Sequence, residues 1–179
     1  MTGAATGRVL VSACLLGRPV RYDGRAKRSD DVVLARWTRE GRVVPLCPEV
    51  AAGLPTPRPP AEIRAGRVVE RDGRDVTDLY ERGARITVET ARRAGCRHAL
   101  LTDGSPSCGS TFRYDGTFEG GRVGGEGLVA AALRRAGVAV WPETEVAALD
   151  ARLRAGGVVQ DAAGIAEAGP ISLGNRIDL

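Results

Sequence analysis

The sequence predicts a single three-layer α/β domain: a mainly parallel sheet of about four core strands with helices on both faces, plus a small hairpin insertion. Two observations predict this fold class. Short, nearly continuous apolar runs, as in strands covered on both faces, alternate along the chain with longer amphipathic segments. That alternation is typical of a parallel sheet between two helical layers. The length, 179 residues, is that of one such domain.

The four apolar runs are the predicted strands: Val9-Leu10-Val11, Val43-Val44, Ala99-Leu100-Leu101 and Val138-Ala139-Val140. Four segments with apolar residues at helical spacing are the predicted helices, and most have a capping residue at the start and all a glycine at the end. They run from Ser29-Asp30 to Gly41, from Asp75 to Gly95, from Leu128 to Gly137 and from Val146 to Gly156.

Two connections are longer than a compact fold requires, and both follow the end of a predicted strand. Residues 48–74 hold five of the ten prolines and a predicted hairpin from Ile63 to Glu70, with its turn at Ala65-Gly66. Residues 103–126 are rich in glycine. Open α/β sheets bind ligands at the carboxyl ends of their strands, so both loops are expected to carry function. Residues 1–155 are then expected to form this single domain, and the weakly periodic residues 156–179 are expected to be a tail and not a second domain.

Composition excludes several classes of protein. The longest apolar run, Leu128 to Leu133, is too short to span a membrane, and no secretory signal is visible, which predicts a cytoplasmic protein. The net charge of +4 comes from dispersed arginines and the single lysine, Lys27. A dispersed excess suits either an anionic small molecule or a weak nucleic-acid contact. Seven aromatic residues are too few for a base-stacking platform, so no stable nucleic-acid complex is expected. One histidine cannot build an imidazole-rich zinc site, and four cysteines are too few for a disulfide scaffold.

Fold geometry sorts the four cysteines into three and one. Cys14, Cys47 and Cys108 each follow a predicted strand, whereas Cys96 precedes one. In a parallel sheet the first three lie along one edge, and Cys96 lies roughly 17–20 Å away at the other. Three convergent thiols would leave one position open on a metal centre, although free cysteines are often simply buried apolar residues. Their spacing matches no local zinc or ferredoxin signature and does not name the metal.

The tetrapeptide Arg-Tyr-Asp-Gly occurs twice, at residues 21–24 and 113–116. Each copy follows a strand-end cysteine. Asp-Gly favours a tight turn, so the two copies are either similar turns or two walls of one pocket.

Several longer motifs surround the strand-end cysteines and the loops that follow: Val11–Gly17, Val20–Gly24, Cys47–Val50, Gly53–Arg58, Glu62-Ile63, Asp75–Thr77, Ser105–Gly109 and Tyr114–Phe118. Through these motifs the chain resembles the thiouracil desulfidase family over roughly residues 8–145.

The resemblance implies that Cys14, Cys47 and Cys108 hold a 4Fe-4S cluster whose fourth iron has no protein ligand. That iron would bind the sulfur of a thiolated uracil, either 4-thiouracil or 4-thiouridine monophosphate, and water would replace the sulfur. Glu49 matches the family's acid/base residue and Ser105 its second catalytic candidate. The side chains expected to bind the substrate are Ser12, Asp23, Lys27, Arg58, Ser107 and Asp115.

Two other functions stay open at the level of sequence. A non-catalytic metal-binding structural or sensor module would have a closed site, with His98 or Cys96 as fourth ligand. A metal-free thiol enzyme would use Cys14 or Cys108 as nucleophile and needs an adjacent base. The chain is expected to be a monomer or a weak homodimer.

Overall fold

The computed structural model describes residues 7–163. Its elements in chain order are β1 (Val9–Ser12), the 3-10 helix η1 (Ala13–Leu16), α1 (Val32–Arg39), β2 (Val43–Leu46), α2 (Pro48–Ala51), β3 (Ala61–Arg64), β4 (Arg67–Glu70), α3 (Thr77–Arg93), β5 (His98–Leu101), β6 (Phe112–Tyr114), β7 (Arg122–Gly124), α4 (Leu128–Arg135), β8 (Ala139–Pro142), the 3-10 helix η2 (Glu143–Glu145) and α5 (Val146–Ala163).

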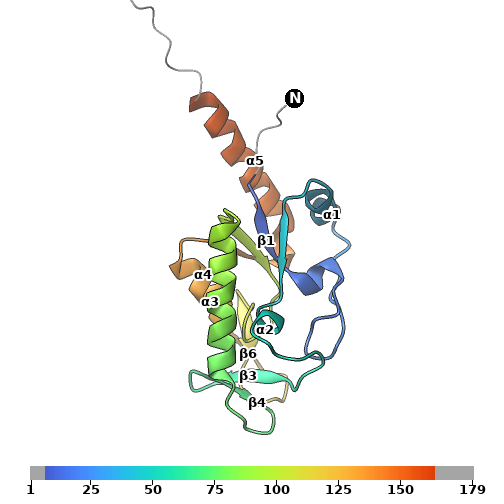
Figure 1. Ribbon diagram of the computed structural model, residues 1–179, viewed down its shortest axis with the longest axis vertical. Helices are drawn as coiled ribbons and strands as arrows, with labels where there is room; N and C mark the ends of the chain where they lie inside the picture. The colour runs from blue at the N-terminus through green and yellow to red at the C-terminus, as the bar shows by residue number, and fades with distance from the viewer. Residues whose placement is uncertain (1–6, 164–179) are drawn as a thin grey trace, which may run out of the picture.

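The central sheet has four strands in the order β2-β1-β5-β8, and every pair is parallel. The predicted fold class is therefore confirmed. Figure 1 shows the sheet between two helical layers, with α3 and α4 on one side and α1 on the other. The carboxyl ends of the strands point toward the end of the molecule that carries the β3–β4 hairpin. Helix α5 runs back past the sheet and extends beyond its opposite end.

Alternate residues of the strands serve two separate cores, because successive side chains of a strand point to opposite faces. Leu10 of β1 packs toward α3 and α4, whereas its neighbours Val9 and Val11 pack toward α1 and α5. Both faces of these strands are thus covered, which explains why each reads as a continuous apolar run.

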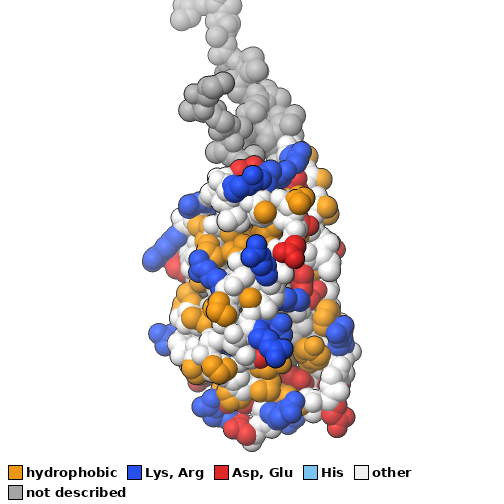
Figure 2. Space-filling model, turned by 90° about the vertical axis from the view of Figure 1, so that its right-hand side faces the viewer, with side chains coloured by type: hydrophobic (Ala, Val, Ile, Leu, Met, Phe, Trp, Pro, Cys, Tyr) orange, Lys and Arg blue, Asp and Glu red, His pale blue; other side chains and the backbone are white. Residues whose placement is uncertain are grey.

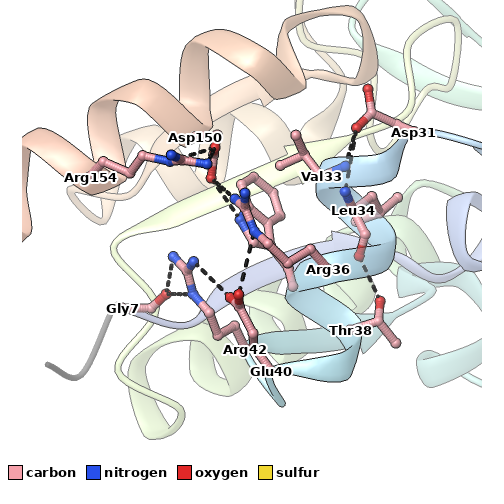
Figure 3. A network of polar contacts seen from close by, with 11 residues as sticks. Gly7, Asp31, Val33, Leu34, Arg36, Thr38, Glu40, Arg42, Asp150 and Arg154 are labelled. Carbon is pink, nitrogen blue, oxygen red and sulfur yellow. Dashed lines mark hydrogen bonds and ion pairs between the residues drawn. The ribbon is translucent and has the colours of Figure 1, made fainter. Parts of the chain in front are cut away.

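A buried carboxylate joins α1 to α5 on the second face of the sheet. Asp150 accepts hydrogen bonds from Trp37 Nε1 at 3.0 Å and from Arg154 Nε at 2.9 Å, and it also pairs with Arg36. Figure 3 shows this network between the two helices. Burial opposes ionisation of Asp150, but these donors outweigh it and lower the pKa of the carboxyl.

Two antiparallel hairpins stand apart from the central sheet. The predicted one pairs β3 with β4, and its turn at Ala65-Gly66 has both residues at positive φ. A second hairpin, β6–β7, lies within the glycine-rich residues 103–126 and was not predicted. Its strands have three residues each, and those of β7 are all exposed, so no apolar alternation marks them in the sequence.

Two predicted helix boundaries were wrong. Helix α1 starts later than expected, because Asp31 rather than Ser29-Asp30 caps it, accepting from the amides of Val33 and Leu34. Helix α5 does not stop at Gly156 but continues to Ala163. Glycine permits the left-handed stop of a helix without imposing one. The start of the expected tail, residues 156–163, is therefore helical, and residues 164–179 and 1–6 lie outside the described residues.

Charges are dispersed over the surface, as the sequence predicted. The face shown in Figure 2 carries Lys and Arg side chains along its length, interspersed with acidic and apolar ones. Within residues 7–163, no helix has both the length and the apolar composition needed to cross a membrane.

Candidate active site

A cavity of about 490 Å³ lies at the carboxyl ends of β1, β2 and β5. Its inner wall comes from the segments that directly follow these strands, and its outer wall comes from the two hairpins. This is the edge at which open parallel sheets bind ligands. It is also the edge at which the two long loops were expected to act.

Three cysteines line this cavity, and the fourth does not. Cys14 lies in η1, Cys47 directly precedes α2, and Cys108 lies in the loop between β5 and β6. All four cysteines are free thiols. Cys96 precedes β5 and is buried among apolar side chains of the α3–α4 core, outside the cavity lining.

The environment of the three cavity thiols favours their protonated form. Burial raises the pKa of the Cys14 and Cys108 thiols, and the neighbouring Glu49 is the second cause for both. The pKa of Cys108 lies well above the usual value of a thiol. The same two causes raise the pKa of Cys47 to about 12. Cys14 and Cys47 both act electrostatically on Cys108, so the three sulfurs form one coupled group. A metal that binds these thiols as thiolates must therefore displace protons.

The Cys108 loop is held by its own polar side chains. The Asp103 carboxylate accepts hydrogen bonds from the amides of Ser110 and Thr111, which closes the loop. Inside it, Ser105 Oγ accepts from the amide of Ser107 at 3.0 Å and from that of Cys108 at 3.1 Å. Ser105 thus has both a structural role in the turn and a place in the cavity lining.

Close backbone approaches fix the same loop further. A Cβ on Gly109 would lie 2.6 Å from the carbonyl oxygen of Phe112, and one on Gly127 would lie 2.3 Å from that of Ser107. Only glycine fits at these two positions, because a side chain at either would push the loop that carries Cys108.

Glu49 reaches the cavity from the first turn of α2, where Pro48 is favoured at the preceding helical position. Its side chain is buried, and its Oε2 lies 3.2 Å from Cys47 Sγ and 3.9 Å from Arg58 Nη2. A carboxylate, a thiol and a guanidinium therefore meet on one wall.

Arg58 is buried beside them and is held by main-chain oxygens. Its Nη1 donates to the carbonyls of Val20 at 3.2 Å and Pro55 at 3.3 Å. Its Nε is buried and has no hydrogen-bond partner in the described part of the chain. The predicted binding residue thus lines the cavity, and the hydrogen bonds that hold it come from Nη1.

Lys27 lines the cavity from the segment after η1. Its ammonium pairs with Glu143 of η2 and donates to Thr102 Oγ1 at 3.1 Å. The other oxygen of Glu143 accepts from the amide of Asp103 at 2.6 Å. Glu143 therefore joins the segments that follow β1, β5 and β8. The sequence analysis missed it because nothing near η2 marks a site.

The four remaining predicted residues differ in their positions. Ser12 lines the cavity, and its Oγ accepts from the amide of Thr102 at 3.1 Å. Ser107 is outside the lining, and its buried Oγ has no hydrogen-bond partner among the residues that the structure describes. Asp23 and Asp115 are outside the lining, and each accepts from the amide two residues further on. The first copy of the repeated tetrapeptide forms a turn, in which the amide of Gly24 donates to the carbonyl of Arg21, whereas the second copy begins within β6. Each copy contributes its tyrosine, Tyr22 or Tyr114, to the cavity.

The sequence analysis also missed most of the outer wall. Tyr80 of α3 and several hairpin residues line the cavity: Glu62, Arg71, Phe112, Phe118 and Arg122. Glu62 lies 15 residues after Cys47 along the chain, whereas Phe112 lies only four residues after Cys108. The sequence marked this region through the two long loops and the motifs Glu62-Ile63 and Tyr114–Phe118, but did not single out these side chains.

The donor set suits a cluster better than a single ion. Across residues 7–163, no three His, Cys, Asp or Glu side chains surround one point closely enough to hold a metal ion. Ligands of a four-iron cluster need no common point, because each binds a different iron. Three free thiols facing one roomy cavity fit such a group, and thiolates are the ligands that iron–sulfur clusters use.

Comparison with known proteins gives consistent matches over this part of the chain. A family model described as 2-thiouracil desulfurase matches residues 9–145. The uncharacterized protein YbbK of Bacillus subtilis (strain 168) is 39% identical over 148 residues, which is 77% of this chain and 97% of that protein. A solved structure named [4Fe-4S]-dependent thiouracil desulfidase TudS is 48% identical, with a TM-score of 0.82, and the match covers 83% of this chain and 99% of that one.

Proposed function

This chain belongs to the 2-thiouracil desulfurase family, and from that premise we propose that it is a [4Fe-4S]-dependent desulfidase of thiolated uracils. The reaction replaces the thiocarbonyl sulfur of the substrate by oxygen from water. Thiouracil and water give uracil and hydrogen sulfide, with no net oxidation or reduction.

The observation that carries the proposal is the meeting of Cys14, Cys47 and Cys108 at one cavity, with Cys96 elsewhere. When bound by three thiolates, a [4Fe-4S] cluster supplies one iron without a protein ligand, and iron of this kind has affinity for sulfur. The alternative of a closed structural site has less support, because neither Cys96 nor His98 lines the cavity. His98 instead accepts a hydrogen bond from Trp141.

Glu49 is the group best placed to handle protons. Hydrolysis needs water to lose two protons and sulfur to gain them, so a carboxylate beside the reacting atoms can take a proton from water and pass it on. Glu49 is the buried carboxylate that lies next to a cavity thiol, and its Oε2 lies 3.9 Å from Nη2 of Arg58.

Ser105 can donate its hydroxyl hydrogen to the substrate or to the attacking water. Its oxygen already accepts from two backbone amides, which fixes its position, and its own hydrogen remains available. Lys27 and Arg58 add positive charge to the same cavity.

The proposed substrates are 4-thiouracil and 4-thiouridine monophosphate. The cavity of about 490 Å³ has to hold both the cluster and the substrate. The cations that line it, Arg21, Lys27, Arg71 and Arg122 among them, suit a phosphate group.

The proposal is tested by purifying the protein without oxygen and measuring iron and acid-labile sulfide. We expect about four irons per chain and a brown colour. Added 4-thiouracil should lose its near-ultraviolet absorbance as sulfide appears in equal amount. A metal-free, colourless protein that turned over 4-thiouracil would overturn the role of the cluster, and a brown protein without sulfide release would overturn the desulfidase activity.

A further inference from the structure

Glu62 of β3 is a second buried carboxylate in the cavity lining, in addition to Glu49. Its side chain is 9% exposed. One oxygen, Oε2, accepts from the amide of Gly116 at 2.8 Å and from that of Phe118 at 3.1 Å. These bonds tie the β3–β4 hairpin to the turn that follows β6.

The other oxygen, Oε1, accepts no hydrogen bond from the described part of the chain. No Lys or Arg nitrogen among residues 7–163 lies within 4.0 Å of this carboxylate. The other buried glutamates of this region differ, because Glu49 lies near Arg58 and Glu70 is paired with Arg74. A buried carboxylate without a cation is costly unless a ligand completes its hydrogen bonds.

The local backbone is shaped to present this carboxylate. Gly116 has a φ of 91°, and a Cβ there would lie 2.8 Å from the carbonyl oxygen of Ile63. Phe118 is in the left-handed region with a φ of 62°, a conformation that residues with a side chain rarely adopt. Gly116 and Phe118 both give their amide hydrogens to Glu62 Oε2. Strain of this kind at the wall of a cavity is a pointer to function.

We propose that Glu62 is a substrate-recognition residue whose Oε1 accepts a hydrogen bond from a ring N–H of the thiopyrimidine. Thiouracil carries two such donors, and its carbonyl and thiocarbonyl groups are acceptors only. A carboxylate only accepts hydrogen bonds, so it can bind a ring N–H of the pyrimidine but cannot hydrogen-bond to its carbonyl or thiocarbonyl group. In a nucleotide the ring nitrogen N1 bears the sugar, so N3–H is the ring donor from which Glu62 can accept a hydrogen bond. The inference rests on the proposed function.

The substitution Glu62→Gln tests this directly. The glutamine oxygen is expected to stay on the amides of Gly116 and Phe118, so its NH₂ group replaces Oε1. That group cannot accept a substrate N–H. The variant would lose a hydrogen bond to a charged group, which contributes to the free energy of substrate binding. KM for 4-thiouracil should therefore rise about 10- to 100-fold. Iron content should be unchanged, and uracil, the product, should bind correspondingly more weakly in calorimetry.

Glu70→Gln is the matched control. Glu70 is also buried in the same hairpin but lies outside the cavity lining and is held by Arg74. If loosening of the hairpin caused the effect of Glu62→Gln, Glu70→Gln would raise KM to the same extent, and the inference would be wrong.

A second measurement uses the unmodified protein and does not depend on the folding of a variant. 1-Methyl-4-thiouracil and 3-methyl-4-thiouracil each lack one ring N–H. The protein should turn over the 1-methyl compound and discriminate against the 3-methyl compound by at least tenfold in kcat/KM. Equal turnover of both compounds would overturn the inference while leaving the desulfidase activity established. Failure to release sulfide from any of the three compounds would instead overturn the proposed function.

Discussion

The sulfur of Cys47 lies 3.2 Å from Oε2 of Glu49, its neighbour two residues along the chain. The first turn of α2 brings about this contact, because Cys47 caps the helix and Glu49 occupies its first turn. The thiol donates to the carboxylate, and the neighbouring Glu49 is, after burial, the second cause that raises the pKa of Cys47. One short helix thus places a thiol and a carboxylate on the same wall, the pair for which we propose the roles of cluster ligand and proton acceptor.

Replacing Glu49 by Gln should abolish proton handling while keeping the shape of the wall. We expect kcat for 4-thiouracil to fall about 10²- to 10⁴-fold, the range of general acid/base contributions. Iron content and the visible spectrum should stay close to those of the unmodified protein, which separates catalysis from cluster binding. A Glu49→Gln protein with full activity and full iron content would exclude Glu49 as the acid/base group.

Substitution of each cysteine by Ala should separate the three cysteines that line the cavity from Cys96, which does not line it. Cys14→Ala, Cys47→Ala and Cys108→Ala should each lower iron content and remove activity, because each takes one ligand from the cavity. Cys96→Ala should retain iron and colour and lose only some stability, since its thiol packs in the α3–α4 core. Iron analysis and visible absorbance of the anaerobically purified variants measure this. Bleaching of Cys96→Ala would contradict the assignment.

Lys27→Met should weaken binding of the nucleotide more than binding of the free base, because the ammonium lies in the cavity wall. We expect KM for 4-thiouridine monophosphate to rise about tenfold and that for 4-thiouracil to change little. Arg28→Met is the control, since the Arg28 side chain is largely exposed and outside the lining. Equal changes for both substrates would show that Lys27 does not contact phosphate.

Gly127→Ala should disturb the Cys108 loop from outside the cavity. Its Cβ would lie 2.3 Å from the carbonyl oxygen of Ser107, the residue next to Cys108. We expect lower iron occupancy and a lower melting temperature. Gly124→Ala, where a Cβ has no neighbour within 4 Å, should leave both unchanged. If the two variants retained iron equally, the close approach would not matter for the cluster.

Asp150→Asn should make the unfolding free energy less dependent on pH. The folded pKa of Asp150 is lowered below the unfolded value of about 3.9, so its stabilisation is present above that pH and lost as pH falls through the folded pKa. We expect a loss of about 1–3 kcal/mol at pH 7 and a smaller difference at pH 3. Urea unfolding at both pH values measures this, with the exposed Asp30→Asn as control. A constant difference would mean that ionisation contributes nothing.

The sequence by itself determined the parallel sheet and the division of the cysteines. Strands buried on both faces must be apolar throughout, so β1 and β5 are visible as short runs. Strand direction then places Cys14, Cys47 and Cys108 at one edge and Cys96 at the other. The sequence did not determine where every helix ends, because glycine allows a helix to end without requiring it. Helix α5, for example, continues through Gly156.

Only the tertiary structure decided what surrounds the three thiols. Glu62 meets the amide of Gly116, and Lys27 meets Glu143, across long separations in the chain. Such contacts leave no period or motif, since each depends on how separate loops dock at the strand ends. The structure likewise placed Asp23 and Asp115 in turns and their tyrosine neighbours in the cavity. Local patterns dictate which backbone each segment forms, whereas the side chains that share a cavity depend on the packing of segments that are distant in sequence.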